Sequence, residues 1–348
     1  MPTVEPSTIQ ATITGTIAVL LAAACWALSG IFVKLIMVDD QVSSLTLAFW
    51  RDTAAFVVFL ILGTVTQRNR MEIRRSDWPV IAGMGVSLGV FHVALNLGYR
   101  LNGAAITTIQ QAAMPAMVLL VARMVWKEPL TGLKIFSLII IAMGTVMVSG
   151  LIQAGAPEVS VASIAVGFLV PALYAGWSLF GKALRSGYSA VVTLAWAFGI
   201  ASLILLPGQL FTGSLLPPPV PAIAYLWFGG LIGISTVFAF FVFTFALGRL
   251  PAGIASILVM SEIAFAVFYA HLFLGETLTP IELAGALVVV AGVILLLGPG
   301  VATKAIRPFL HRSCAWCARY RYLSGRQEGL SNTTALLFGS GWTWLVLD

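Results

Sequence analysis

The chain alternates between long apolar runs and short polar breaks, and this alternation constrains its fold more than any other feature. Each run is about 20 residues long, the length that a helix needs to cross roughly 30 Å of hydrocarbon. The composition agrees, because 59% of the 348 residues are hydrophobic, 9% are charged and the mean hydropathy is +1.00. We therefore predict an all-α integral membrane protein with ten transmembrane helices, over residues 15–36, 43–65, 78–99, 103–125, 131–150, 159–181, 189–210, 221–247, 252–274 and 279–298.

Other classes of protein fit this composition poorly. A soluble domain carries about 25% charged residues. A transmembrane β-barrel needs alternating segments of about 10 residues, whereas stretches such as 138–141 (Leu-Ile-Ile-Ile) do not alternate. No cleavable signal peptide is expected, because residues 1–14 lack Lys and Arg and the first apolar run is long enough to span.

The basic residues are sorted between the two predicted faces of the membrane. With the N-terminus inside, 16 Lys and Arg residues fall on the cytoplasmic side, against Lys34 and Arg100 outside, while Arg51 lies within a span. This bias predicts that both termini are cytoplasmic. The net charge of +6 therefore reflects topology, and no nucleic-acid partner is expected.

The sequence matches itself when it is shifted by 148 residues. The matches extend over five spans, which predicts a first repeat over 15–150 and a second over 159–298, joined by a linker over 151–158. A cytoplasmic N-terminus (1–14) and a basic cytoplasmic tail (299–348) flank them. The coinciding pairs are Trp26 with Tyr174, Lys34 with Lys182, Gly85 with Gly233, Arg123 with His271, Glu128 with Glu276, Thr131 with Thr279, Gly144 with Gly292 and Gly150 with Gly298.

An odd number of spans in each repeat has a topological consequence. The second copy must enter the membrane from the opposite side, so the two five-helix copies form an inverted-topology repeat. Such repeats place a binding site at their interface near mid-membrane, and rocking of one half against the other exposes it to alternate sides. Two G-x-x-x-G patterns, Gly85 to Gly89 and Gly229 to Gly233, predict close helix approach.

The polar break at the start of the last span has the composition of a helix N-terminus. Thr279, Pro280 and Glu282 fit a T-x-x-E capping box with proline at the first helical position. The stretch is therefore predicted to be a junction between spans. Its equivalent in the first repeat begins at Lys127.

The tail contains a C-x-x-C pair, Cys314 and Cys317, with only His311 nearby. A structural zinc site needs four ligands, so we expect reduced thiols, no metal and no cofactor.

Together these motifs resemble the EamA branch of the drug/metabolite transporter superfamily. The resemblance covers about residues 15–298 and is carried by the ten spans in two halves, the run from Trp26 to Lys34, Phe49-Trp50-Arg51 and the Glu-x-Leu-Thr junction after the fourth and ninth spans. It implies an inner-membrane carrier of small metabolites, similar to bacterial exporters of amino acids, aromatic ones included. Members often carry Glu-Pro in the ninth span, whereas Glu262 is followed here by Ile263, which leaves a kink there open.

Polar and aromatic residues inside the spans are the candidate site, because a charged side chain in hydrocarbon costs about 2.5 to 3.5 kcal/mol. His92, Asn96 and Tyr99 recur at steps of four and three and so share one helical face. Either they line a cavity or they hold helices together by hydrogen bonds. The candidate substrate-binding residues are Trp26, Ser29, His92, Asn96, Tyr99, Thr107, Gln110, Gln111, Tyr174, Trp177 and Glu262.

Three charged residues are candidates for gating or coupling: Arg51, Asp52 and Glu262. Glu262 lies near the middle of the ninth span and is a candidate for binding a substrate ammonium or for taking up a driving proton. Arg51 and Asp52 are adjacent, so their side chains point about 100° apart, and each is expected to pair with another helix or to contribute to gating or substrate contact.

The sequence favours a secondary transporter that works by alternating access, and the resemblance points to export of amino acids, neutral or aromatic. A carrier of another small metabolite or drug, such as an amine or nucleoside, is the alternative; a membrane-embedded enzyme or a receptor fits less well, since H-E-x-x-H and P-loop motifs are absent. The expected partners are a small-molecule substrate, membrane lipid and, if transport is coupled, a proton. The chain is expected to act as a monomer or homodimer.

Overall fold

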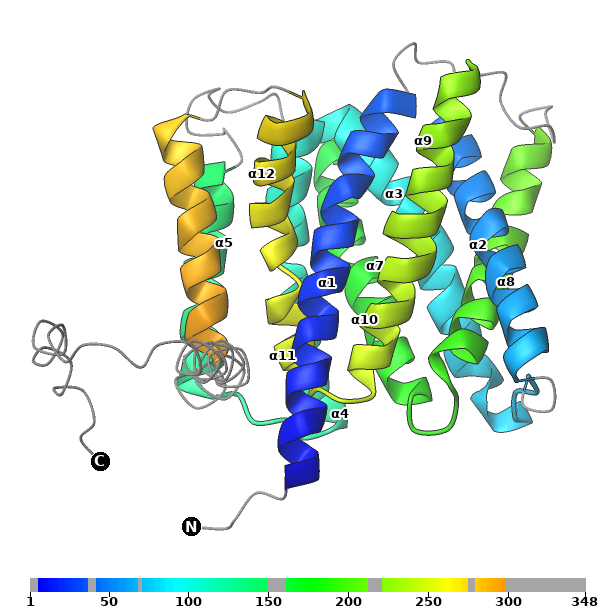
Figure 1. Ribbon diagram of the computed structural model, residues 1–348, viewed down its shortest axis with the longest axis horizontal. Coiled ribbons are helices and arrows are strands. Elements are labelled where there is room, and N and C mark those ends of the chain that lie inside the picture. Colours follow the sequence, from blue (N-terminus) through cyan, green and yellow to red (C-terminus); the bar gives the residue numbers. More distant parts are fainter. Residues whose placement is uncertain are drawn as a thin grey trace, which may run out of the picture. The chain divides into compact units, whose positions relative to one another are not determined.

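The computed structural model describes residues 6–36, 42–67, 71–148, 161–211, 221–274 and 279–297. Every regular element within these ranges is helical, as predicted, and they contain no strand (Figure 1). The predicted tail with Cys314 and Cys317, the whole of the predicted linker and the junction residue Glu276 lie outside the described residues.

Eight helical stretches within the described ranges are long and apolar enough to span a membrane, and two shorter apolar helices, α4 and α5, accompany them. Their boundaries follow the predicted spans closely, except that α1 begins well before residue 15 and α3 continues past the predicted boundary between the third and fourth spans to Gln111. The elements are α1 (Pro6–Ile36), α2 (Ser44–Thr66), α3 (Trp78–Gln111), α4 (Met114–Val125), α5 (Gly132–Val148), α7 (Val161–Leu184), α8 (Ala190–Phe211), α9 (Ala222–Ile232), the π-helix η3 (Gly233–Phe238), α10 (Ala239–Leu247), α11 (Ala252–Leu258), α12 (Ser261–Leu274) and a last helix, Pro280–Leu297.

The predicted capping box is confirmed at the start of the last helix. The Glu282 carboxylate accepts hydrogen bonds from the Thr279 amide (2.8 Å) and hydroxyl (2.9 Å), and the Glu282 amide lies 3.4 Å from the Thr279 hydroxyl oxygen. Thr131 similarly accepts the Lys134 amide at the start of α5. These side chains satisfy amides that have no partner within their own helix.

The boundary between the third and fourth predicted spans falls inside α3, where the chain reverses direction. A Cβ on Gly98 would lie 3.1 Å from a side-chain carbon of Thr107. Nine residues of straight helix would separate these positions by about 13 Å, so α3 bends back on itself between them.

Two of the predicted spans are interrupted: the fourth, which was drawn as one segment, and the ninth, where a kink beside Glu262 was left open. The fourth is interrupted by a turn at Ala112 and Ala113, immediately before Met114 and Pro115. The proline lacks an amide proton and would clash with the carbonyl of Gln111, which explains the break. The ninth is interrupted at Val259 and Met260, so it breaks without proline.

The helices pack in pairs that repeat between the two halves. α3 packs on α7, and the equivalent pairing joins α1 to α9 and α10; α2 packs on α8, its own equivalent. Figure 1 shows α1 crossing in front of α7, beside α10.

Only one of the two G-x-x-x-G predictions is confirmed. A Cβ on Gly85 would lie 2.6 Å from Ile200 of α8, and one on Gly89 would lie 3.0 Å from the Ala201 backbone, so these glycines permit close approach of α3 and α8. Among the described residues, a Cβ on Gly229 or Gly233 would meet nothing within 4 Å, so close approach is not found there.

One end of the bundle collects several connections, and we call it the Glu128 face. It is formed by residues 126–131, 185–189 and 248–251, since Glu128 and Lys182 both bond to the connection that follows α10. α1 begins at this face, where Gly15 contacts Leu250, whereas α7, its equivalent in the second half, ends there at Lys182.

Candidate functional site

A cavity of about 120 Å³ lies between the two halves, with room for about ten water molecules. Its walls come from α1, α2, α3, α7, α10 and α12. The predicted site residues that line it are Trp26, Ser29, Arg51, His92, Asn96, Gln111, Tyr174, Trp177 and Glu262.

Aromatic rings form one wall of the cavity. Trp26 and Tyr174, which are equivalent in the repeat, meet edge to face at 6.3 Å, and Tyr174 stacks on Trp177 at 5.5 Å. Phe240 contacts Trp26 and Trp177, each at 5.0 Å between ring centroids. These rings suit an apolar or aromatic group, since aromatic pairs prefer such edge-to-face and offset geometries.

An arginine and a glutamate share the cavity. Arg51 comes from the second turn of α2, and Glu262 comes from the first turn of α12, where the second half of the broken ninth span begins. A carboxylate in the first turn of a helix is stabilised by the positive end of the helix dipole. The break in the ninth span therefore places Glu262 at a favourable helix start beside the cavity.

The Arg51 guanidinium is anchored on the π-helix. Its Nε donates to the Thr236 hydroxyl oxygen at 2.7 Å, and Thr236 in turn donates to the Leu231 carbonyl at 2.8 Å. Thr236 is completely buried and Arg51 nearly so. Thr236 was missed by the sequence reasoning, because nothing in the primary structure predicts a π-helical turn at this position.

Asp52 pairs with His92 across α2 and α3. The Asp52 carboxylate lies 2.6 Å from His92 Nδ1, and the two side chains are 0% and 1% exposed. The prediction that Arg51 and Asp52 each pair with another helix is thereby confirmed. This contact is a buried hydrogen bond that joins α2 to α3.

The remaining predicted residues do not line the cavity. Asp52 lies behind His92, Thr107 is buried at the bend of α3, and Gln110 packs against Gly167 of α7. The side chain of Tyr99 lies outside the described residues. Phe91, Phe240 and Met260 line the cavity without having been predicted, because phenylalanine and methionine give no signal in so apolar a chain.

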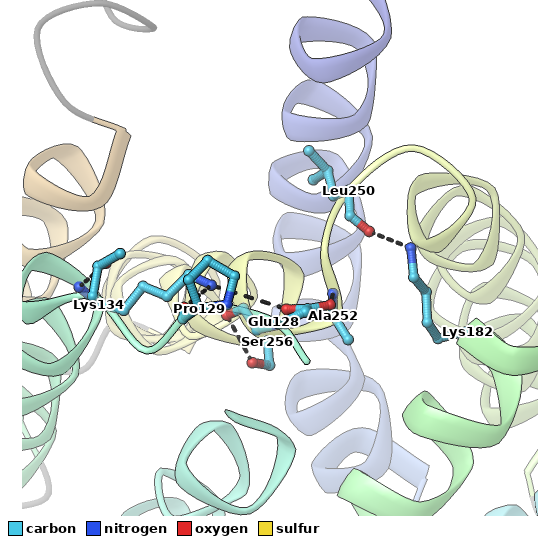
Figure 2. A network of polar contacts seen from close by, with 9 residues as sticks. Glu128, Pro129, Lys134, Lys182, Leu250, Ala252 and Ser256 are labelled. Carbon is cyan, nitrogen blue, oxygen red and sulfur yellow. Dashed lines mark hydrogen bonds and ion pairs between the residues drawn. The ribbon is translucent and has the colours of Figure 1, made fainter. Parts of the chain in front are cut away.

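The Glu128 face is held together by hydrogen bonds to the connection between α10 and α11, from Glu128 of the first half and from Lys182 of the second (Figure 2). Glu128 accepts the amides of Ala252 (2.8 Å) and Gly253 (3.1 Å) at the start of α11, and Lys182 donates to the carbonyls of Leu247 (2.7 Å) and Leu250 (2.6 Å). Figure 2 shows the two side chains reaching the same connection from opposite sides. We call this set of contacts the Glu128 latch.

Lys134 supports the latch from the first half. Its Nζ donates to the Pro129 carbonyl at 3.0 Å and lies 3.9 Å from the Glu128 carboxylate, and the side chain is buried. A buried cation needs such partners to offset its desolvation. Lys134 therefore holds Glu128 in place rather than facing solvent.

The cavity lies toward the end of the bundle that is opposite to the Glu128 latch. It is lined by the last third of α1, from Trp26 to Val33, and by Arg51 near the start of α2. α1 leaves the Glu128 face at its N-terminus, and α2 starts at the other end, so both segments lie away from the latch.

Metal coordination finds no support in the part of the chain that the structure describes. No group of three or more His, Cys, Asp or Glu side chains there could hold a metal ion.

The fold defines a helical membrane protein built from two similar halves around a shared cavity. The chain belongs to the EamA-like transporter family, whose model matches it twice, over residues 13–150 and 161–298. The two matches start 148 residues apart, the offset predicted from the sequence, so the duplication and the family resemblance are confirmed. The protein is accordingly a membrane transporter.

Relatives in other organisms agree with this class. The chain is 25% identical to a protein of Archaeoglobus fulgidus described as an uncharacterized transporter, over 69% of this chain and 83% of the relative. Similar proteins with that description occur in Helicobacter pylori (25% identity, 80% of this chain and 93% of the relative) and in Bacillus subtilis, where it is called YdfC (23%, 71% and 79%).

The fold is also similar to that of solved structures, among them a crystal structure of a protein. It has a TM-score of 0.65 at 14% sequence identity and covers 83% of this chain and 98% of its own.

Proposed function

We propose that the protein is a secondary carrier that exports amino acids, neutral or aromatic, across the bacterial inner membrane by alternating access. The observation that carries the substrate class is the combination in one cavity of Arg51, Glu262 and the wall formed by Trp26, Tyr174 and Trp177. A zwitterion presents a carboxylate to the guanidinium and an ammonium to the carboxylate. The aromatic wall accommodates its side chain.

The transport cycle in this proposal uses ten spans arranged as two inverted five-helix copies. Its support is that α1 begins and its equivalent α7 ends at the Glu128 face, which is the relation between copies of opposite topology. The bend of α3 at Gly98 and Thr107 separates a third from a fourth span. Inverted copies can exchange conformations, so that each side of the membrane opens in turn.

The conformation of the molecule fits one state of that cycle. The Glu128 latch closes one end, and the cavity lies toward the other. Arg74, Arg75, Lys127, Arg185 and Arg249 lie at or next to the latched end, which by the positive-inside rule is the cytoplasmic one, with both termini on that side. The structure then corresponds to a state closed toward the cytoplasm.

An amine is the second candidate substrate. Glu262 beside Trp26 and Trp177 also suits a cation, because an ammonium group binds both a carboxylate and the face of an aromatic ring. The two candidates differ in one group, the carboxylate, and this difference makes them separable by experiment.

Counterflow into proteoliposomes that contain the purified protein tests the proposal. Radiolabelled phenylalanine and, in a second series, radiolabelled phenethylamine are offered against internal phenylalanine, phenethylamine, 3-phenylpropionate or uridine, with protein-free liposomes as the control. We expect exchange with phenylalanine and weak exchange with the two analogues that carry one charge each. Exchange of phenethylamine alone would replace the amino-acid assignment by an amine, and exchange of none of the four would refute both. A parallel series with an imposed pH gradient tests proton coupling.

A further inference from the structure

The buried pair of Asp52 and His92 has no role in the substrate contacts proposed above. The Asp52 carboxylate lies 2.6 Å from His92 Nδ1, and both side chains are almost completely excluded from solvent. The second carboxylate oxygen of Asp52 and Nε2 of His92 have no hydrogen-bond partner among the described residues. Titratable groups are costly inside a membrane protein, and those that remain there commonly mark ion or proton pathways.

The pair can take up one proton and keep its hydrogen bond. Asp52 and His92 together carry one net negative charge when they hold one proton between them, and no net charge when they hold two. The hydrogen bond between them can form in both states, because a carboxyl group and an imidazole nitrogen each donate when protonated and accept when not. The pair is therefore a unit that is able to bind and release one proton.

The His92 imidazole lies where the two halves meet. It stacks on Phe198 of α8, with ring centroids 6.4 Å apart, and meets Phe240 of α10 edge to face at 5.8 Å. Both of these helices belong to the second half, whereas the pair belongs to the first. His92 also lines the cavity, from which water can deliver a proton. Movement of one half against the other therefore changes which side of the membrane supplies the pair with protons.

Other titratable groups lie around the pair in the described part of the chain. Arg51 of α2 acts on His92 electrostatically, Glu262 of α12 lines the same cavity, and Tyr174 of α7 contacts Phe91, which precedes His92. From α8 and α10 the imidazole is faced by phenylalanine, which does not titrate. A proton taken up by the pair cancels its negative charge, so it also changes the field in the substrate cavity.

We propose that Asp52 and His92 form the binding site of a coupling proton, and that the carrier exchanges one proton moving inward for each amino acid moving outward. The inference rests on the proposed function and deepens it, because it names the ion that drives export. The proton and the amino acid occupy separate groups, since Asp52 lies behind His92 and does not line the cavity.

Proteoliposomes that contain the purified protein separate coupled from uncoupled transport. The lumen is made more acidic than the outside, and equal potassium with valinomycin holds the membrane potential at zero. Uptake of external radiolabelled phenylalanine is followed together with the pH of the lumen, which trapped pyranine reports. A one-to-one exchange with protons should accumulate phenylalanine about tenfold for each pH unit of the gradient and should make the lumen less acidic. Counterflow at equal pH on both sides measures exchange without net proton movement.

The decisive variant is Asp52→Asn, which keeps the shape of the side chain and removes the carboxyl group. We expect it to exchange phenylalanine in counterflow close to the wild-type rate but to lose accumulation. His92 without the carboxylate would gain a net positive charge beside Arg51 on binding a proton, and like charges repel. Asp77→Asn is the matched control, because Asp77 also accepts one hydrogen bond of 2.6 Å, from the Tyr188 hydroxyl, and lies outside the cavity. It should accumulate phenylalanine as the wild type does.

Three results would overturn the inference and leave the proposed function in place. A wild type that exchanges phenylalanine but never accumulates it would show that no proton is coupled. Undiminished accumulation in Asp52→Asn would show that another group carries the proton, and loss of exchange as well as accumulation in this variant would show a structural role. The double variant Asp52→Ile with His92→Phe removes both titratable groups and is measured in parallel, so accumulation in it overturns the inference even if Asp52→Asn fails to fold. A wild type that does not exchange phenylalanine at all would overturn the proposed function as well.

Discussion

The two halves of the chain surround the cavity with equivalent positions that carry different chemistry. His92 of the first half meets its equivalent in the second, Phe240, at 5.8 Å between rings. Glu262 of the second half is equivalent to Met114, which is completely buried. The repeated backbone thus builds a two-fold frame, while the side chains make the site one-sided. A site with this asymmetry can hold a zwitterion in a single orientation.

The broken spans show the same contrast. The fourth span breaks before Pro115, whereas the equivalent residue after the break in the ninth span is Ile263. There the interruption is made by short-range bonds, because the amides of Met260, Glu262 and Ile263 reach carbonyls only three residues back. A break that proline enforces in one half is therefore maintained by tighter turns in the other, and it places a carboxylate at the start of α12.

The largest expected effect comes from replacing the buried pair of Asp52 and His92 by the residues at the equivalent positions of the second half. His92→Phe leaves the Asp52 carboxylate buried without its partner, and losing one member of a buried pair costs about 3 to 5 kcal/mol. We expect a loss of that size in unfolding free energy, measured by thermal unfolding in detergent. Adding Asp52→Ile, which copies Ile200, should recover more than half of it. If His92→Phe alone were as stable as the wild type, the pair of Asp52 and His92 would contribute nothing to stability.

Exchanging Glu262 for the residue at its equivalent position tests the charge asymmetry directly. Glu262→Met should fold, because methionine occupies the same place in the first half, but it removes the proposed partner of the substrate ammonium. A loss of about 2 kcal/mol corresponds to roughly 30-fold weaker phenylalanine binding. Glu72→Gln, at an exposed glutamate outside the cavity, is the control. Unchanged binding in Glu262→Met would remove Glu262 from the site.

Proline substitution tests whether the ninth span is broken as firmly as the fourth. Ile263→Pro loses only the amide bond to the Met260 carbonyl, in the first turn of α12, and should cost about 1 kcal/mol. Val267→Pro, one turn further into the same helix, should cost about 3 kcal/mol or more. Thermal unfolding of both variants gives the comparison. Equal costs would mean that the chain is helical through residue 260 in solution.

The two glutamates that cap helices also differ between the halves. Glu128 caps α11 from another element, whereas Glu282 caps its own helix. An amide nitrogen cannot accept, so each Gln variant loses one bond worth about 1 kcal/mol. Only Glu128→Gln should shift the conformational equilibrium, by about fivefold toward opening of the Glu128 face. Alkylation of a cysteine introduced at Ser256, which is completely buried in α11, reports this opening once Cys314 and Cys317 are replaced by serine. Equal labelling in both variants would mean that the latch has no gating role.

The sequence predicted much of this architecture because its strongest signals are local. Apolar runs define where helices lie, and Thr279 with Glu282 defines where one begins. His92 and Asn96, four residues apart, were correctly placed on one face, and both line the cavity. Gln110 and Gln111 were not separable, since the turn at Ala112 that decides between them depends on how α4 packs. The contact between Thr236 and Arg51 joins positions 185 residues apart, which no local pattern encodes.

The smallest expected effect concerns the residue before Glu128. Lys127 has a φ of 54°, a left-handed conformation that costs a residue with a Cβ about 1 kcal/mol, and its equivalent in the second half is Gly275. Lys127→Gly should raise the unfolding free energy by about 0.5 kcal/mol, because the added freedom of glycine in the unfolded chain offsets part of the relief. Arg123→Gly, in the last turn of α4, should instead lower it by about 1 kcal/mol. The unfolding free energy of both variants is measured by thermal unfolding. An increase in Lys127→Gly with transport unchanged, together with a decrease in Arg123→Gly, would show that the backbone strain lies at residue 127. A decrease in both variants would show that the lysine side chain contributes more to stability than the strain costs.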